Sequence, residues 1–249
     1  MSPRFQSHRP ALDPWDGILL VDKPSGPTSH DIVDRIRRHF RFKKVGHGGT
    51  LDPMATGLLI MLLGRGTKIS NQIMGSDKTY EGTMFLGAST DTQDCDGVVT
   101  FEGDASGVTR ERLEEEMKKW IGDVQQIPPM VSAIKKDGVP LYKLARKGQE
   151  IEREPRLLHI YEFRILDFAL PRVTFRLRCT KGTYVRTLCA DIGAALGCGG
   201  HLQQLRRTMS GDFDVANAIT MVDLLELNAD SLIPRIIPLS DFRPQQPPA

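Results

Sequence analysis

Three glycines, a histidine and an aspartate lie within eight consecutive residues of this chain. The segment at residues 46–53 contains His47 and Asp52, and Pro53 follows Asp52 directly. Glycines let the backbone approach a bound ligand closely, and a carboxylate fixed beside a proline can act as an acid, a base or a nucleophile. The segment therefore predicts a loop at which one carboxylate does chemistry.

The motifs around this loop do not fit two common classes of enzyme. His47-Gly48-Gly49 is similar to the oxyanion loop of some esterases, but the sequence contains no Gly-x-Ser-x-Gly motif. Residues 64–68 contain two glycines, a threonine and a lysine, but they lack the Gly-x-x-x-x-Gly-Lys-Ser/Thr spacing of a phosphate-binding loop. We therefore expect neither an esterase nor a nucleoside triphosphatase.

The segments on either side of this loop predict the helices and strands that position it. Residues 17–22 predict a short buried strand that ends at a loop rich in proline and glycine. Thr28 or Ser29 can cap the following helix, in which apolar residues recur at helical spacing. Residues 55–63 are almost entirely apolar, and this run predicts a buried helix directly after the loop.

Later segments of the chain are also periodic. Residues 172–179 alternate between apolar and polar or basic side chains, which predicts a strand with one buried face. Residues 184–196 predict a helix. Thr109 can cap another helix that runs through Trp120 and Ile121, and its exposed face explains an acidic run. Five prolines from Pro234 onward predict that about the last dozen residues form a tail.

Charge is distributed unevenly along the 249 residues, although 33 Lys and Arg against 31 Asp and Glu give a net formal charge of only +2. Residues 35–44 and 172–207 are strongly basic, whereas residues 102–123 are acidic. A basic face is typical of proteins that bind a polyanion such as nucleic acid. Most charge runs, however, are only solvated faces. Charge alone leaves both interpretations open.

Neither a membrane span nor a cysteine-based site is predicted. The longest apolar runs are far shorter than the roughly 20 residues that a membrane-spanning helix needs. The first sixteen residues carry no secretory signal, so we expect a cytoplasmic protein. The four cysteines are irregularly spaced and form no Cys-x-x-Cys motif, which predicts reduced thiols rather than a zinc site or a disulfide framework.

The ten residues from Gly48 to Gly57 resemble the catalytic signature of the TruB family of tRNA pseudouridine synthases. Further family segments match in the correct order at residues 17–23, 77–80, 89–92, 94–97, 126–136, 141–142, 181–186 and 201–207. Several matches in order are more specific than one short motif. On these residues the chain is identified as a member of the family.

The resemblance implies an α+β protein with the pseudouridine synthase fold, in which helices and RNA-binding loops flank a mixed, mainly antiparallel sheet. It implies isomerisation of uridine to pseudouridine at position 55 in the T loop of tRNA, without a metal or an organic cofactor. Asp52 matches the family's nucleophilic aspartate, and the target base is expected to flip out of the RNA. Attack at C1′, addition at C6, and proton removal from the sugar to give a glycal all remain compatible with one carboxylate.

Three more side chains match family residues. Arg186 matches the arginine that pairs with the aspartate, because a carboxylate under a flipped nucleotide needs a partner to stay ionised and oriented. Tyr80 matches the tyrosine that stacks on the target base and can accept a proton at C5, although a lone strand tyrosine is more often a core residue. His47 matches the histidine that fills the space left by the flipped uridine.

The resemblance also implies binding roles. Tyr184 and Leu205 correspond to residues that line the uracil pocket, although an ordinary core position is an equal alternative for Leu205. Phosphate contacts are expected for Lys23, Lys68 and residues 35–44. Residues 124–152 correspond to a mobile segment that closes over RNA.

The domain organisation is expected to depart from the family pattern. We expect a catalytic domain at residues 1–211 and a short C-terminal extension at residues 212–249, without the full PUA-type RNA-binding module of many family members. That departure puts contacts to the acceptor end of tRNA in doubt. The expected partner is the T stem-loop of tRNA, and we expect a monomer that binds neither a membrane nor a metal. A non-catalytic tRNA-binding folding factor is the alternative function.

Overall fold

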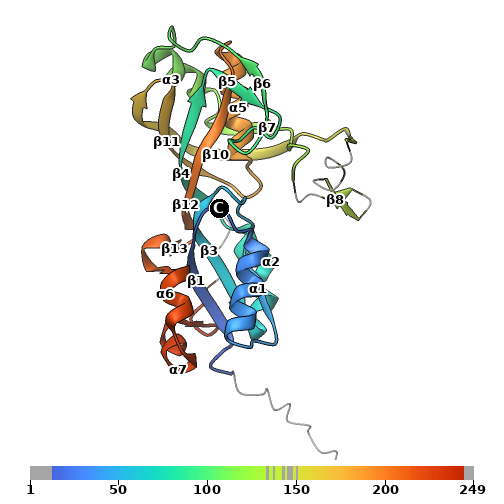
Figure 1. The fold of residues 1–249 in the computed structure, drawn as a ribbon, viewed down its shortest axis with the longest axis vertical. Coiled ribbons are helices and arrows are strands. Elements are labelled where there is room, and N and C mark those ends of the chain that lie inside the picture. The colour runs from blue at the N-terminus through green and yellow to red at the C-terminus, as the bar shows by residue number, and fades with distance from the viewer. Residues whose placement is uncertain are drawn as a thin grey trace, which may run out of the picture.

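A long mixed sheet runs through the protein from end to end (Figure 1). The structure is a computed structural model. It describes residues 13–132, 135–136, 138–141, 144, 148–149 and 151–243. Within this part of the chain the large sheet has eleven strands, and its main path runs in the order β14-β1-β3-β12-β4-β11-β10-β7.

The strands of the large sheet are short at its edges and long at its centre. They are β1 (Gly17–Lys23), β2 (Val45–His47), β3 (Thr56–Leu63), β4 (Lys78–Leu86), β7 (Gly122–Gln126), β10 (Arg156–Ala169), β11 (Arg172–Cys179), β12 (Gly200–Ser210), β13 (Phe213–Asp214), β14 (Ile219–Thr220) and β15 (Ile237–Pro238). Only the β1–β14 and β3–β12 pairings are parallel among those described. The expected α+β fold with a mixed, mainly antiparallel sheet is confirmed.

Helices cover the sheet, and two small hairpins project from it (Figure 1). The helices are α1 (Ser29–His39), α2 (Ser70–Gly75), α3 (Arg110–Lys118), α5 (Val185–Ala195), α6 (Met221–Glu226) and α7 (Ala229–Leu232). The hairpins are β5 (Ala88–Thr90) with β6 (Val99–Glu102), and β8 (Lys135–Lys136) with β9 (Val139–Pro140). None of the described helices is long and apolar enough to cross a membrane.

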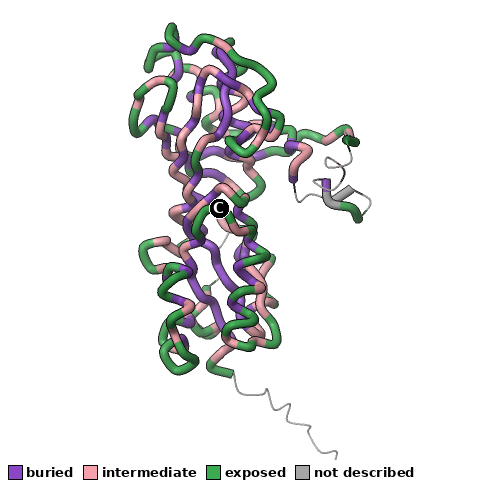
Figure 2. Tube along the Cα trace, viewed as in Figure 1, coloured by how far each residue is buried: buried purple, intermediate pink, exposed green. Residues whose placement is uncertain are grey.

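The helix predicted at residues 55–63 is wrong, because this segment is strand β3. Leu59, Met61 and Leu63 pack into one hydrophobic cluster with α1, whereas Leu58, Ile60 and Leu62 pack into a second cluster with Ile73 of α2. A strand buried on both faces loses the alternation that identifies a half-buried strand. Figure 2 shows this buried core as purple segments along the sheet.

Local signals determine the other predicted elements, and these are present, although the helix predicted to run through Trp120 and Ile121 is shorter than expected. Thr28 forms a capping box with Asp31 at the start of α1. The Thr109 side chain caps α3, which ends at Lys118. In β11 the apolar residues of the alternation are all buried. One face of each element is therefore fixed against the core.

The C-terminal residues pack more extensively than the predicted tail. β15 pairs with β1, β14 extends the sheet beyond β1, and Phe242 stacks on Phe213 with ring centroids 6.4 Å apart. Packing therefore continues to Phe242, and residues 244–249 lie outside the described residues. The division into domains at residue 211 stays a prediction.

Candidate active site

The glycine-rich loop between β2 and β3 holds Asp52 at the centre of the sheet. The Ser29 hydroxyl accepts a hydrogen bond from the Leu51 amide at 2.9 Å and donates one to the Leu51 carbonyl at 3.1 Å. Gly49 has a φ of +135°, which side chains rarely tolerate. These contacts fix the backbone of the loop. Leu51, the residue directly before Asp52, is buried and makes two hydrogen bonds with Ser29.

The buried Lys23 side chain binds backbone carbonyls at both ends of this region of the chain. Its Nζ donates to the carbonyl oxygens of Pro24 at 3.0 Å, Pro53 at 3.0 Å and Ala55 at 2.7 Å. The side chain is fully buried, and this burial lowers the pKa of Lys23 to about 8. An ammonium group has three hydrogens, so none is left for a phosphate. The structure therefore does not support the phosphate contact expected for Lys23.

The lowered pKa of Lys23 predicts how its contribution to stability depends on pH. The folded-state pKa of about 8 lies below the unfolded value of 10.5, so the unfolded chain binds more protons between these values. Stability from this group therefore rises with pH across that window, by about 3 kcal/mol in total. The measurement is the free energy of unfolding in urea, determined for the parent and for Lys23→Met at pH values between 8 and 10.5. We expect the difference between the two proteins to change by this amount, in favour of the parent, as the pH rises. A pH-independent difference between the two proteins contradicts the assignment.

Arg186 lies between two carboxylates. Its Nη1 is 3.6 Å from Oδ2 of Asp52 and 3.3 Å from Oδ2 of Asp94, and its Nη2 donates to the Val131 carbonyl. The side chains of Arg186 and Asp94 are 5% and 7% exposed, whereas that of Asp52 is 40% exposed. Of these three groups, only Asp52 is open to a substrate.

The charge of Asp52 depends on opposing effects. Burial raises the pKa of its carboxyl group, the Arg186 guanidinium lowers it, and the nearby Asp94 carboxylate raises it again. The net shift is upward. Asp94 is fixed in place because it accepts hydrogen bonds from the Thr92 hydroxyl at 2.6 Å and the Asp96 amide at 3.2 Å. The fixed Asp94 carboxylate therefore raises the pKa of Asp52 and also binds its partner, Arg186.

Tyr80 approaches the loop from β4. It lies opposite Arg207 of β12 in the antiparallel pairing of these two strands. Burial raises the pKa of the Tyr80 hydroxyl to about 12, so the phenol stays protonated near neutral pH. A neutral hydroxyl and an aromatic face are thus both present at this position.

Tyr184 and Leu205 flank the site in different ways. Tyr184 is the residue before α5, and its amide and carbonyl bond the Gln126 side chain at 2.8 and 3.1 Å. Its ring centroid lies 5.8 Å from the guanidinium carbon of Arg186. Leu205 is 8% exposed and lines a groove of about 810 Å³ that also includes Met54. Tyr184 is thus beside the charged pair, and the two alternatives for Leu205 stay open.

His47 lies two residues before Gly49 of the loop, whereas Lys68 lies in the 3₁₀ helix at Gly64–Ile69. His47 is half-buried on β2, and its Nδ1 accepts a hydrogen bond from the Gly49 amide at 3.3 Å. Burial lowers the pKa of the His47 imidazole, which favours the neutral ring. Lys68 is exposed. The base-replacing role of His47 and the phosphate contact of Lys68 stay predictions.

The chain matches two family models over most of its length. Residues 37–185 match the model described as "TruB family pseudouridylate synthase (N terminal domain)", and residues 186–240 match "tRNA pseudouridylate synthase B C-terminal domain". The first model alone covers more than half of the chain. The chain belongs to the TruB family.

Relatives within the TruB family are close in sequence. A tRNA pseudouridine synthase B of Opitutus terrae is 52% identical over 92% of this chain and 95% of that protein. The protein of the same name from Syntrophotalea carbinolica is 48% identical over 89% of this chain and 72% of that protein.

A solved structure is also similar in fold. One chain in the crystal structure of a Cbf5-Nop10-Gar1 complex is 30% identical, with a TM-score of 0.73 over 92% of this chain. The present chain spans 61% of the length of that chain.

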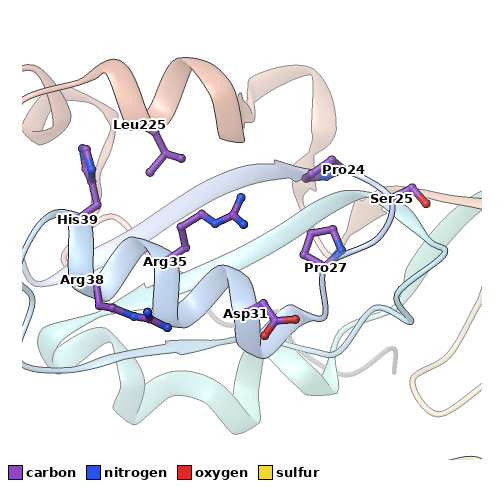
Figure 3. Close-up of a pocket in the computed structure, with 8 residues that line it drawn as sticks. All are labelled: Pro24, Ser25, Pro27, Asp31, Arg35, Arg38, His39 and Leu225. Carbon is purple, nitrogen blue, oxygen red and sulfur yellow. The ribbon is translucent and has the colours of Figure 1, made fainter.

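The basic segments of this TruB family member are only partly available for RNA. Arg35, Arg38 and His39 of α1 line a cleft of about 1060 Å³ that Leu225 of α6 closes on the other side (Figure 3). The cleft reaches Pro24, next to the loop of Asp52.

In the segment at residues 172–207, by contrast, the last two arginines are engaged within the protein. Arg206 is paired with Asp22, and Arg207 is buried. Part of residues 124–152, including the side chains of all five basic residues there, lies outside the described residues, so the expected closure over RNA stays a prediction.

Sequence reasoning missed Asp94, which binds Arg186, and Arg207, whose guanidinium donates to the Gly49 and Thr50 carbonyls before Asp52. Asp94 lies in a segment that matches the family, but nothing in the spacing links it to a residue 92 positions later. Arg207 lies in a basic run and looks like a surface cation. Both roles depend on contacts that only the folded sheet creates.

Proposed function

We propose that this chain isomerises uridine to pseudouridine at position 55 in the T loop of tRNA, with Asp52 as the catalytic carboxylate. The observation that carries the proposal is the partly exposed Asp52 carboxylate held against a buried arginine that Asp94 also binds. Family membership supplies the substrate class, because the matched relatives are named tRNA pseudouridine synthase B.

The geometry suits a reaction that needs one carboxylate and no net transfer of atoms. Isomerisation breaks the bond from N1 of the base to C1′ of the ribose, turns the base, and forms a bond from C5 to C1′. The hydrogen on C5 leaves as a proton and N1 gains one. Asp52 can act at C1′, at C6 or on a sugar proton, since Arg186 opposes the effect of burial on the pKa of this carboxyl group and orients it. Tyr80 and Tyr184 offer aromatic faces for the flipped base.

The same proposal covers partners and organisation. The T stem-loop is the RNA element recognised, and the basic cleft along α1 and the exposed Lys68 offer cations for its phosphates. We place the reaction in the cytoplasm, with a monomeric enzyme whose catalytic domain covers residues 1–211. Membership of the TruB family supports an enzyme over a folding factor that only binds tRNA.

Mapping pseudouridine in an unmodified tRNA transcript tests this function directly. We expect one pseudouridine, in the T loop at position 55, after incubation with the purified protein. A transcript with cytidine at that position is the matched control, and we expect it to stay unmodified. Modification elsewhere, or binding without any modification, contradicts the proposal and favours the non-catalytic alternative.

A further inference from the structure

The Gln126 side chain at the end of β7 binds the backbone of Tyr184. Gln126 is only 3% exposed. Its Oε1 accepts a hydrogen bond from the Tyr184 amide at 2.8 Å, and its Nε2 donates one to the Tyr184 carbonyl at 3.1 Å. Only this orientation of the side-chain amide pairs a donor with an acceptor in both bonds. One buried side chain thus binds both backbone groups of a residue 58 positions later.

Tyr184 is an unusual residue for the start of a helix. It is the N-cap residue of α5, and its side chain makes no capping hydrogen bond. Serine, threonine, aspartate and asparagine are preferred at this position, because their side chains accept hydrogen bonds from the first turn. A sequence breaks such a local rule mainly where function requires another side chain. The backbone at this helix start is instead fixed from a distant strand, by Gln126.

The start of α5 carries two side chains of the candidate active site. The Tyr184 ring centroid lies 5.8 Å from the guanidinium carbon of Arg186, and Nη1 of Arg186 lies 3.6 Å from Oδ2 of Asp52. The position of the Tyr184 backbone therefore sets where its ring lies relative to the Asp52 carboxylate. A displacement of about 1 Å in such a site can lower a rate about 100-fold.

The backbone of Gln126 is fixed, because this residue ends a strand of the large sheet. Gln126 lies opposite Arg156 in the antiparallel pairing of β7 with β10. The chain then reaches the site again at Val131, whose carbonyl accepts a hydrogen bond from Nη2 of Arg186. This stretch of chain therefore contacts both Tyr184 and Arg186 and is part of the framework of the site.

We propose that Gln126 is a positioning residue for the isomerisation, which holds the Tyr184 backbone so that the Tyr184 ring contacts the flipped base. The inference rests on the proposed function, because it needs a uracil base beside this ring. Gln126 itself does not touch the RNA, since it is buried and both its polar atoms are bound to Tyr184. It acts through the ring that it positions.

A double-mutant cycle tests whether Gln126 acts through the Tyr184 ring. Gln126→Met keeps the length of the side chain and removes the amide, whereas Tyr184→Ala removes the ring and keeps the backbone groups. The parent, both single variants and the double variant are compared by single-turnover pseudouridine formation at saturating tRNA, by tRNA affinity and by thermal unfolding. We expect Gln126→Met to lower the rate about tenfold or more and to change affinity by less than about threefold. In the Tyr184→Ala background the same change should lower the rate by a factor at least about five times smaller.

Gln72→Met is the matched control for this cycle. Gln72 lies on α2 and is exposed, so the same chemical change is made away from Tyr184. Gln72 has no role in the proposed site. We expect the rate and the affinity of this variant to stay within about twofold of the parent values.

The Gln126→Met variant is expected to fold. The Tyr184 carbonyl also accepts a hydrogen bond from the Leu188 amide of α5 at 3.2 Å. An open cavity of about 300 Å³ adjoins Gln126 and Thr187, so water can reach the freed backbone groups. If the variant does not fold, amide hydrogen exchange of the parent replaces the cycle. We expect slow exchange of the Tyr184 amide, whose acceptor is Gln126, and exchange as fast as in an unfolded chain contradicts the inference.

Three outcomes of the cycle overturn the inference while leaving the proposed function intact. Equal rate losses from Gln126→Met in both backgrounds show that Gln126 does not act through the Tyr184 ring. An unchanged rate in a folded Gln126→Met variant removes the positioning role, whatever the change in thermal stability. A loss confined to tRNA affinity shows that Gln126 serves binding rather than the reaction. An inactive parent, in contrast, refutes the proposed function.

Discussion

Replacing Asp52 by asparagine should abolish pseudouridine formation and leave tRNA affinity within about threefold of the parent. The amide has nearly the shape of the carboxylate, so the loop and the basic cleft are preserved. It cannot act as a nucleophile or as a base, whichever of the three routes the reaction takes. The structure adds a reason for intact binding, because the loop is held by Ser29, Lys23 and Arg207 rather than by Asp52.

The measurement is single-turnover modification of a tRNA transcript, with affinity determined separately by filter binding. Asp123→Asn is a matched control, since the Asp123 side chain is 71% exposed and pairs only with His159 among the described residues. We expect this control to retain the parent rate within about twofold. Residual turnover of Asp52→Asn within about tenfold of the parent refutes the assignment of the catalytic carboxylate.

Residues whose roles are set by near neighbours in sequence are predicted well. The caps of α1 and α3 and the alternation in β11 are local patterns, and the structure contains all three. The pair of Asp52 and Arg186 is also present, with 3.6 Å between its charged atoms. In this case the resemblance to a family, rather than the spacing, supplied the partner.

The misassigned residues share a different property, since their surroundings come from distant segments. Lys23 lies at the end of a strand and precedes a proline, which in sequence is typical of a surface turn, yet carbonyls 30 and 32 residues later bind its ammonium group. The type of a residue predicts average exposure only. A buried cation that bonds carbonyls has no signature in a single sequence, and neither has a strand such as β3 that is covered on both faces.

Replacing Arg186 by lysine should lower the rate of pseudouridine formation about 100-fold or more, with little change in tRNA affinity. The guanidinium reaches Asp52, Asp94 and the Val131 carbonyl from two different nitrogens. A lysine ammonium is a single point charge and cannot span acceptors on several sides of a planar group. We expect it to bind the deeply buried Asp94 and to leave Asp52 without its partner.

The matched control is Arg176→Lys. Arg176 also lies between two carboxylates, at 3.2 Å from Glu81 and 3.7 Å from Glu162, but this cluster is on the solvent-exposed side of the sheet. We expect this control to keep the parent rate within about twofold, because exposed ion pairs contribute little. Unchanged kinetics for Arg186→Lys would remove Arg186 from the active site. A loss confined to tRNA affinity would make it a binding residue, since an interaction made only in the transition state changes the rate and not the affinity.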